Sequence, residues 1–203
     1  MSVMRIFRVA VLVTVGLGFA EPVGADHISY ATTMLEKSSN PVNVTVKELI
    51  FKKKFDELQS YLATVDVNTQ DDKRIGPIHI ASHYGSIEAL RLLIARGAKV
   101  TLPAFGGWST LHYAAQSGYL EIANLLIAMG ISPNIKDVGG ESPLFYAIET
   151  NQLPMVQWLV EHGADPLQAN NAGETPLARA EHEKNKAIID VLQERVKQAS
   201  QPK

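Results

Sequence analysis

A short pattern that returns every 33 residues constrains the fold more than any other feature of this chain. Each copy begins with a small or hydroxyl residue and ends with alanine, and no insertion separates the copies. A glycine preceded by aliphatic residues recurs in phase with it. Because one helix pair cannot cover its own apolar face, this period predicts stacked units that form a solenoid. The copies are Gly76–Ala81, Ser109–Ala114, Ser142–Ala147 and Thr175–Ala180, and the glycines are Gly97, Gly130 and Gly163.

The residue types within the pattern predict two helices in each unit. Pro77, Pro143 and Pro176 suit the first helical position, where the missing N–H is not needed. Ser142 and Thr175 can each offer a hydroxyl to the free backbone N–H groups of the first turn. A glycine after the first helix can adopt a positive φ and let the chain reverse. These turn glycines are Gly85 and Gly118, and the second helices are predicted at 87–96 and 120–129.

This pattern resembles the ankyrin repeat, whose T-P-L-H-x-A signature and period of about 33 residues both match. The resemblance implies an all-α solenoid of helix-turn-helix units with projecting β-turns. The chain departs from the signature where Phe145 and Ala178 replace the histidine, Asn151 and Lys184 replace the turn glycine, and Thr110 replaces the proline. The four recognisable repeats span 71–103, 104–136, 137–169 and 170–202.

Both ends of the array have the features of caps. Residues 46–70 keep the two-helix rhythm with Lys52, Lys53 and Lys54 at the turn, so we interpret them as a degenerate N-terminal cap repeat. The repeat at 170–202 has no following neighbour, and its last helix is polar on one side, as expected of a C-terminal cap. Its polar residues are Gln193, Glu194, Arg195, Lys197 and Gln198.

The N-terminus has the order of charged, apolar and small residues that is typical of a secretory signal. Arg5 and Arg8 precede an apolar run, and the sequence predicts a signal peptide at 1–25, cleaved after Ala25 or after Ala20. A buried first helix is the alternative. Even Ile6–Ala20 would be only about 22 Å long as a helix, too short for a hydrocarbon core of about 30 Å, so we expect no stable membrane span. A periplasmic or secreted location follows, with a linker at 26–45.

Composition and motifs exclude several classes of function. The net charge of −2 gives no electrostatic reason to bind nucleic acid. With no cysteine, the chain has neither a thiol nucleophile nor a thiolate metal site. It also lacks a P-loop, a G-x-S-x-G turn and a dinucleotide glycine motif. We therefore predict no enzyme activity, no catalytic residues and no cofactor.

Three histidines bear on whether the chain holds a metal, and one of them, His79, has both a metal-binding and a structural interpretation. His79 and His83 are spaced to share one helix face and could hold a metal, but the glutamate of H-E-x-x-H is missing. His79 and His112 occupy the signature histidine position, where the resemblance implies a buried imidazole bonded to backbone between repeats. We favour that structural role and predict no metal site. His162 and His182 are predicted to be surface residues.

A concave face made by the turns and first helices is the binding surface that the resemblance implies. The turn tips are predicted at 71–75, 104–108, 137–141 and 170–174, and Phe105 and Trp108 stand out because the fold requires no aromatic residue there. We predict that they bind a partner protein, since interfaces are enriched in aromatic residues. Alternatively, they fold back and pack the turn. The predicted partner-binding residues are Tyr84, Phe105, Trp108, Tyr113, Gln116, Val138, Glu141, Tyr146 and Glu149.

The function predicted from these features is an exported protein-protein interaction module that is monomeric by itself. The partner is a protein whose identity the sequence does not give. Two related alternatives are an accessory or protective subunit of a periplasmic enzyme and a secreted effector that binds a host protein.

Overall fold

The computed structural model describes residues 40–200. The predicted signal peptide at 1–25 and residues 26–39 of the predicted linker lie outside these residues. Within them the chain forms five helix pairs and no β-strand. The pairs are α2 (Pro41–Phe51) with α3 (Phe55–Leu62), α4 (Pro77–His83) with α5 (Ile87–Ala95), α6 (Thr110–Ser117) with α7 (Leu120–Ala128), α8 (Pro143–Glu149) with α9 (Leu153–Glu161), and α10 (Pro176–His182) with α11 (Lys186–Ala199).

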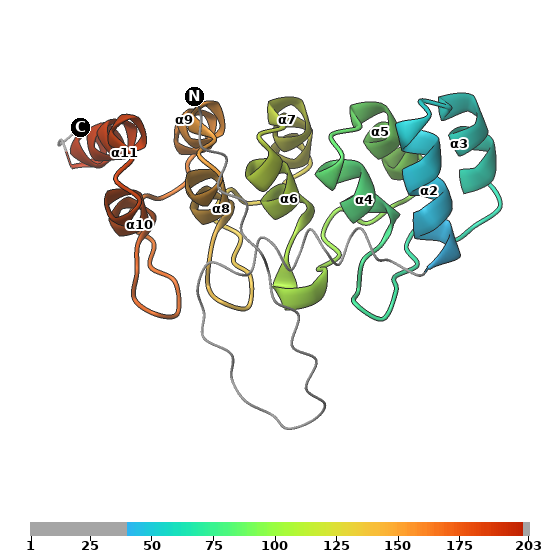
Figure 1. Cartoon of the computed structure of the whole chain (residues 1–203), viewed down its shortest axis with the longest axis horizontal. Coiled ribbons are helices and arrows are strands. Elements are labelled where there is room, and N and C mark those ends of the chain that lie inside the picture. Colours follow the sequence, from blue (N-terminus) through green and yellow to red (C-terminus); the bar gives the residue numbers. More distant parts are fainter. Residues whose placement is uncertain (1–39, 201–203) are drawn as a thin grey trace, which may run out of the picture.

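The helix pairs stack side by side into a solenoid with two rows of helices (Figure 1). The first helices, α2, α4, α6, α8 and α10, form an inner row, and the second helices form an outer row. An alanine that is fully buried in each repeat lets neighbouring inner helices approach closely. These alanines are Ala81, Ala114, Ala147 and Ala180. The predicted all-α solenoid is therefore confirmed.

Most helix boundaries follow the local chemistry that the sequence predicts. Thr175 caps α10, since its hydroxyl accepts a hydrogen bond from the Ala178 N–H at 3.1 Å. The hydroxyl of Ser142 makes no such bond, so its predicted role as a cap is wrong. Gly118 has the positive φ that the turn between paired helices requires, and Asn151 and Lys184, which replace glycine at that turn, both adopt a φ of 56°.

The N-terminal cap begins earlier than the sequence indicates. Helix α2 starts at Pro41 rather than at residue 46, because the side chain of Asn40 caps it by accepting a hydrogen bond from the Val42 N–H at 2.8 Å. Residues 41–45 therefore belong to the cap repeat and not to the linker. The buried Asn43 donates from Nδ2 to the Ile75 carbonyl at 2.9 Å, which fastens the cap to the first repeat.

The last helix closes the other end of the solenoid. At 14 residues, α11 is longer than the nine-residue α9 on which it packs. Ile188 and Leu192 of α11 are buried, whereas Gln193, Glu194 and Lys197 are exposed, as a capping helix requires. Among residues 40–200, no helix combines the length and the apolar character needed to cross a membrane.

Candidate protein-binding surface

Four turns project from the inner row on the same side of the molecule (Figure 1). We call them fingers 1 to 4, and they are residues 71–75, 104–108, 137–141 and 170–174. One backbone hydrogen bond closes each finger, from the N–H of its first residue to the carbonyl of its fifth. These bonds are Asp71 to Ile75 at 2.9 Å, Ala104 to Trp108 at 2.8 Å, Asp137 to Glu141 at 3.0 Å and Asn170 to Glu174 at 2.8 Å.

Backbone hydrogen bonds also join each finger to the next. The N–H of Phe105 donates to Lys73 at 3.0 Å, and the N–H of Val138 donates to Gly106 at 2.8 Å. The N–H of Asn171 donates to Gly139 at 2.9 Å. The four fingers therefore form one connected row, which we call the ledge. Its backbone is held in place before a partner arrives, which lowers the entropic cost of binding.

Finger 2 has a different backbone from the other three. Asp71, Asp137 and Asn170 each accept backbone N–H bonds through a side-chain oxygen at the first finger position, where finger 2 has Ala104. A short 3-10 turn, η1 (Phe105–Gly107), replaces that arrangement. Gly107 has a φ of 79°, and a Cβ there would lie 3.0 Å from the Val138 nitrogen. Glycine at this position thus lets fingers 2 and 3 approach.

Two apolar side chains on the ledge are open to solvent. Phe105 on finger 2 is 52% exposed and Val138 on finger 3 is 73% exposed. The Val138 N–H bond to Gly106 holds the two tips together. Exposed apolar residues that lie together on a rigid surface are typical of protein interaction sites.

Three of the aromatic residues predicted to bind a partner are buried instead. Trp108 is 3% exposed, and Tyr113 and Tyr146 are fully buried. The Trp108 ring lies 4.2 Å from Tyr146 and 5.0 Å from Tyr113, measured between centroids. The prediction that these side chains form an exposed patch is wrong, because Trp108 folds back from the finger and packs between the inner helices. Its role is the packing role that the sequence left as an alternative.

Two further residues predicted to bind a partner, Tyr84 and Gln116, are partly buried and buried, respectively. Tyr84 is partly buried and packs edge-on against Phe51 of α2, with 4.8 Å between ring centroids. Phe51 is 60% exposed and was not predicted, although an aromatic residue at the end of a cap helix is a usable signal. Gln116 is buried, and its carbonyl accepts a hydrogen bond from the Thr150 hydroxyl at 2.8 Å.

His79 and His112 are buried and bonded to backbone, as the sequence predicts, but only His112 bonds to the next repeat, whereas Leu102, the partner of His79, belongs to the same repeat (71–103). Nδ1 of His79 accepts from the Gly76 N–H at 3.0 Å, so Nε2 carries the proton and donates to the Leu102 carbonyl at 2.8 Å. His112 repeats this arrangement between Ser109 and the Glu141 carbonyl, at 2.9 and 3.1 Å.

Burial lowers the pKa of each of these two histidines to about 4. His79 and His112 therefore stay neutral near pH 7. Since the unfolded chain takes up protons near pH 6.5, they stabilise the fold above that pH, and this contribution is lost as the pH falls toward 4.

An ionic network replaces the histidine link between the third and fourth repeats. Phe145 stands where the histidine is expected, and Arg179 of α10 lies over its ring at 5.4 Å. The Arg179 guanidinium donates to Glu141 at 3.1 Å, to Glu174 at 2.5 Å and to Glu149. Sequence reasoning missed Arg179, although the matching position holds tyrosine in the two preceding repeats.

The network has three carboxylates, from Glu141, Glu149 and Glu174, and one guanidinium. The side chain of Glu141 is only 5% exposed, so its predicted contact with a partner is limited. Burial raises the pKa of Glu149 to about 7, an effect that exceeds the opposing attraction of Arg179 and is reinforced by nearby glutamates. The hydrogen bond from Arg179 lowers the pKa of the more exposed Glu174. In addition, the Tyr146 hydroxyl donates to Asp137 at 2.5 Å.

His79 and His83 both lie on α4, and the contacts of His79 bear on the metal-binding interpretation of this pair. Within residues 40–200, no group of three or more His, Asp or Glu side chains could hold a metal ion. His79 uses both ring nitrogens on backbone groups, as the structural interpretation of this residue predicts. His162 lies on the surface, stacked on Trp158 with 3.9 Å between centroids, and His182 is also exposed.

Stacked helix pairs, histidine links and projecting fingers define a repeat solenoid of the kind that binds other macromolecules. A family model described as ankyrin repeats (three copies) matches residues 38–137 and 130–201. The chain therefore belongs to the ankyrin-repeat family, whose members are in general protein-protein interaction modules and typically not enzymes. A search of curated proteins found no match for it.

Proposed function

We propose that this chain is an exported binding module that holds a partner protein against its fingers and inner helices. The observation that carries the proposal is the pair Phe105 and Val138. Both side chains are exposed, they lie on adjacent tips, and the backbone hydrogen bond from Val138 to Gly106 joins those tips. Burying two such side chains under a partner gives favourable apolar contact at little conformational cost.

The polar part of this surface adds selectivity. Glu174 lies on finger 4, its side chain is 31% exposed, and it shares Arg179 with the more deeply buried Glu149. A partner that places a cation near Glu174 gains attraction, and a partner that places an anion there is repelled.

Export is supported by the N-terminal sequence. Arg5, Arg8 and the following apolar run match a secretory signal, and the absence of cysteine is compatible with an oxidising compartment. The test is the mass of the chain recovered from a periplasmic extract or culture medium. A mass that corresponds to removal of residues 1–25 or 1–20 supports export, whereas an intact chain confined to the cytosol contradicts it.

Partner binding is tested by affinity capture with mass spectrometry, using wild type and a Phe105→Ser, Val138→Ser double variant. Both positions are exposed, so the variant should keep the wild-type melting temperature while it loses the captured protein. The matched control is Met129→Ser, which removes an apolar side chain that is 41% exposed and follows the outer helix α7. Equal capture by all three proteins contradicts the proposed surface.

A further inference from the structure

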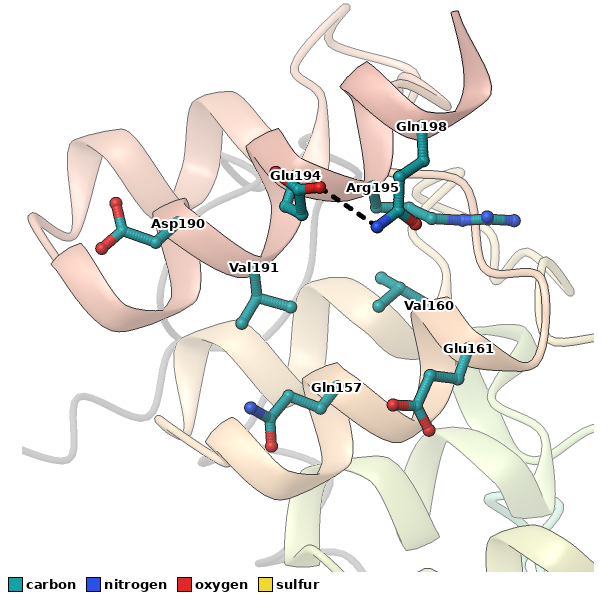
Figure 2. A pocket seen from close by; sticks show the side chains of 8 residues that line it. All are labelled: Gln157, Val160, Glu161, Asp190, Val191, Glu194, Arg195 and Gln198. Carbon is teal, nitrogen blue, oxygen red and sulfur yellow. Dashed lines mark hydrogen bonds between the residues drawn. The ribbon is translucent and has the colours of Figure 1, made fainter. Parts of the chain in front are cut away.

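A second surface lies between the outer helices α9 and α11, on the side of the solenoid away from the fingers (Figures 1 and 2). It consists of two adjacent hollows of about 570 and 270 Å³, and Arg195 lines both. We call the two together the α11 groove. Its first hollow is lined by Gln157, Val160, Glu161, Asp190, Val191, Glu194, Arg195 and Gln198.

The length of α11 creates the second hollow of this groove. Arg195 lines the second hollow together with Val196 and Ala199 of the last turns of α11 and with segment 163–167. Helix α9 ends at Glu161, so the last part of α11 faces this loop rather than a helix. The two hollows follow one another along α11. A helix of a partner protein could contact both of them, which suits this shape better than a small molecule does.

The floor of the groove is aliphatic. In Figure 2, Val191 points from α11 toward α9, and Val160 points from α9 toward α11. Val160 is buried and Val191 is partly buried, so each presents a limited apolar surface. In the second hollow, Leu167 is 52% exposed and Val196 is partly buried. A partner can therefore place apolar side chains at two successive points.

The rim of the first hollow is acidic. Glu161 projects from α9, and Asp190 and Glu194 project from α11 (Figure 2). Asp190 pairs with Lys186 at 3.3 Å, and Glu194 accepts a hydrogen bond from Gln198 at 3.1 Å.

Two of these carboxylates differ from Asp190, which is paired with Lys186. Over the part of the chain that the structure describes, neither Glu161 nor Glu194 belongs to an ion pair. Among the residues that line the first hollow, Arg195 is the one cation. The rim therefore has two carboxylates for which an incoming cation would provide charge complementarity.

We propose that the α11 groove binds a helix of a partner protein that presents aliphatic side chains flanked by lysine or arginine. The side chains of such a helix would enter the space between α9 and α11 as a ridge enters a groove, and an amphipathic helix is a common ligand for such a surface. The flanking cations would meet Glu161 and Glu194. Because this surface is separate from the fingers, the solenoid would hold two partners at the same time.

The test uses synthetic peptides as defined probes, with fluorescence anisotropy on the full chain. The first peptide is a helix of about 18 residues with leucine at i, i+3, i+4 spacing and lysine on both sides of that stripe. The second has glutamate in place of lysine, and the third has serine in place of leucine. We expect saturable binding of the first peptide and at least tenfold weaker binding of the other two.

Matched charge reversals locate the binding on the chain. Glu161→Lys with Glu194→Lys should weaken binding of the first peptide by about tenfold, since two attractions become repulsions. Glu88→Lys with Glu121→Lys changes the net charge equally on the exposed side of α5 and α7, and should leave binding unchanged. A Phe105→Ser, Val138→Ser variant should also bind the peptide, so failure here is separate from failure of the proposed function.

Three results would overturn the proposal. The first is absence of binding by the leucine-lysine peptide. The second is any sign that general charge alone attracts the peptide, either equal weakening by the Glu88→Lys, Glu121→Lys variant or undiminished binding of the serine peptide. The third is a dimer, seen by light scattering of the chain alone, that the Glu161→Lys, Glu194→Lys variant abolishes. This result would assign the groove to a second copy of the chain.

Discussion

Replacing Trp108 with alanine should destabilise the solenoid, although Trp108 belongs to a finger. A buried tryptophan removes up to about 250 Å² from water, which at about 25 cal/mol per Å² sets an upper limit near 6 kcal/mol. Measured core truncations of this kind cost about 3–5 kcal/mol. The ring is 3% exposed and contacts Tyr113 and Tyr146, so we expect a value in that range. Phe105 lies on the same finger but is 52% exposed, so Phe105→Ala should destabilise the fold by no more than about 0.5 kcal/mol.

Thermal unfolding followed by circular dichroism separates these two outcomes. At about 2–4 °C per kcal/mol for a chain of this size, Trp108→Ala should lower the melting temperature by about 6–20 °C. Phe105→Ala should lower it by less than about 2 °C. If the two variants melt together near the wild type, Trp108 does not pack between the inner helices as described.

Two further predictions concern the links between repeats, and a third concerns the turn between α10 and α11. Between pH 4.5 and 6.5, His79 and His112 bind fewer protons in the folded chain than in the unfolded chain, whereas Glu149 binds more. The free energy of unfolding should therefore fall on acidification by about 1.4 kcal/mol per pH unit. Glu149→Gln should steepen that fall, and denaturant titrations at several pH values measure it. Arg179→Met should cost about 3–5 kcal/mol by leaving buried carboxylates without their cation, and a Glu149→Gln change should recover part of the loss in the same titration. Lys184→Gly should stabilise by about 0.5–1 kcal/mol, because lysine there is held at a positive φ, and an unchanged or lower melting temperature contradicts this.

The fold could be predicted because its causes are local and repeated. The proline, hydroxyl, histidine and glycine positions each act within one repeat or between neighbours, so a single copy of the pattern contains the information for the next. His79 and His112 were placed correctly for this reason. The start of α2 at Pro41 was missed because the cap repeat lacks the signature, and only the Asn40 cap marks its first turn.

The binding surface was harder to predict because exposure depends on contacts between repeats. Sequence position assigns Trp108, Tyr113 and Tyr146 to the finger and inner helices, but the direction of each ring is set by its neighbours in three dimensions. Arg179 was missed because its three glutamate partners come from different segments of two repeats. Phe105 and Val138 were identified, and their role in partner binding stays a prediction.

The central claim is that a partner protein covers the fingers. Hydroxyl-radical footprinting of the captured complex, read by mass spectrometry against the free chain, tests it directly. Protection should be concentrated on fingers 2 and 3, at Phe105 and Val138, while Met129 after the outer helix α7 stays as reactive as in the free chain. Protection confined to the outer helices, with Phe105 and Val138 unchanged, would contradict the claim.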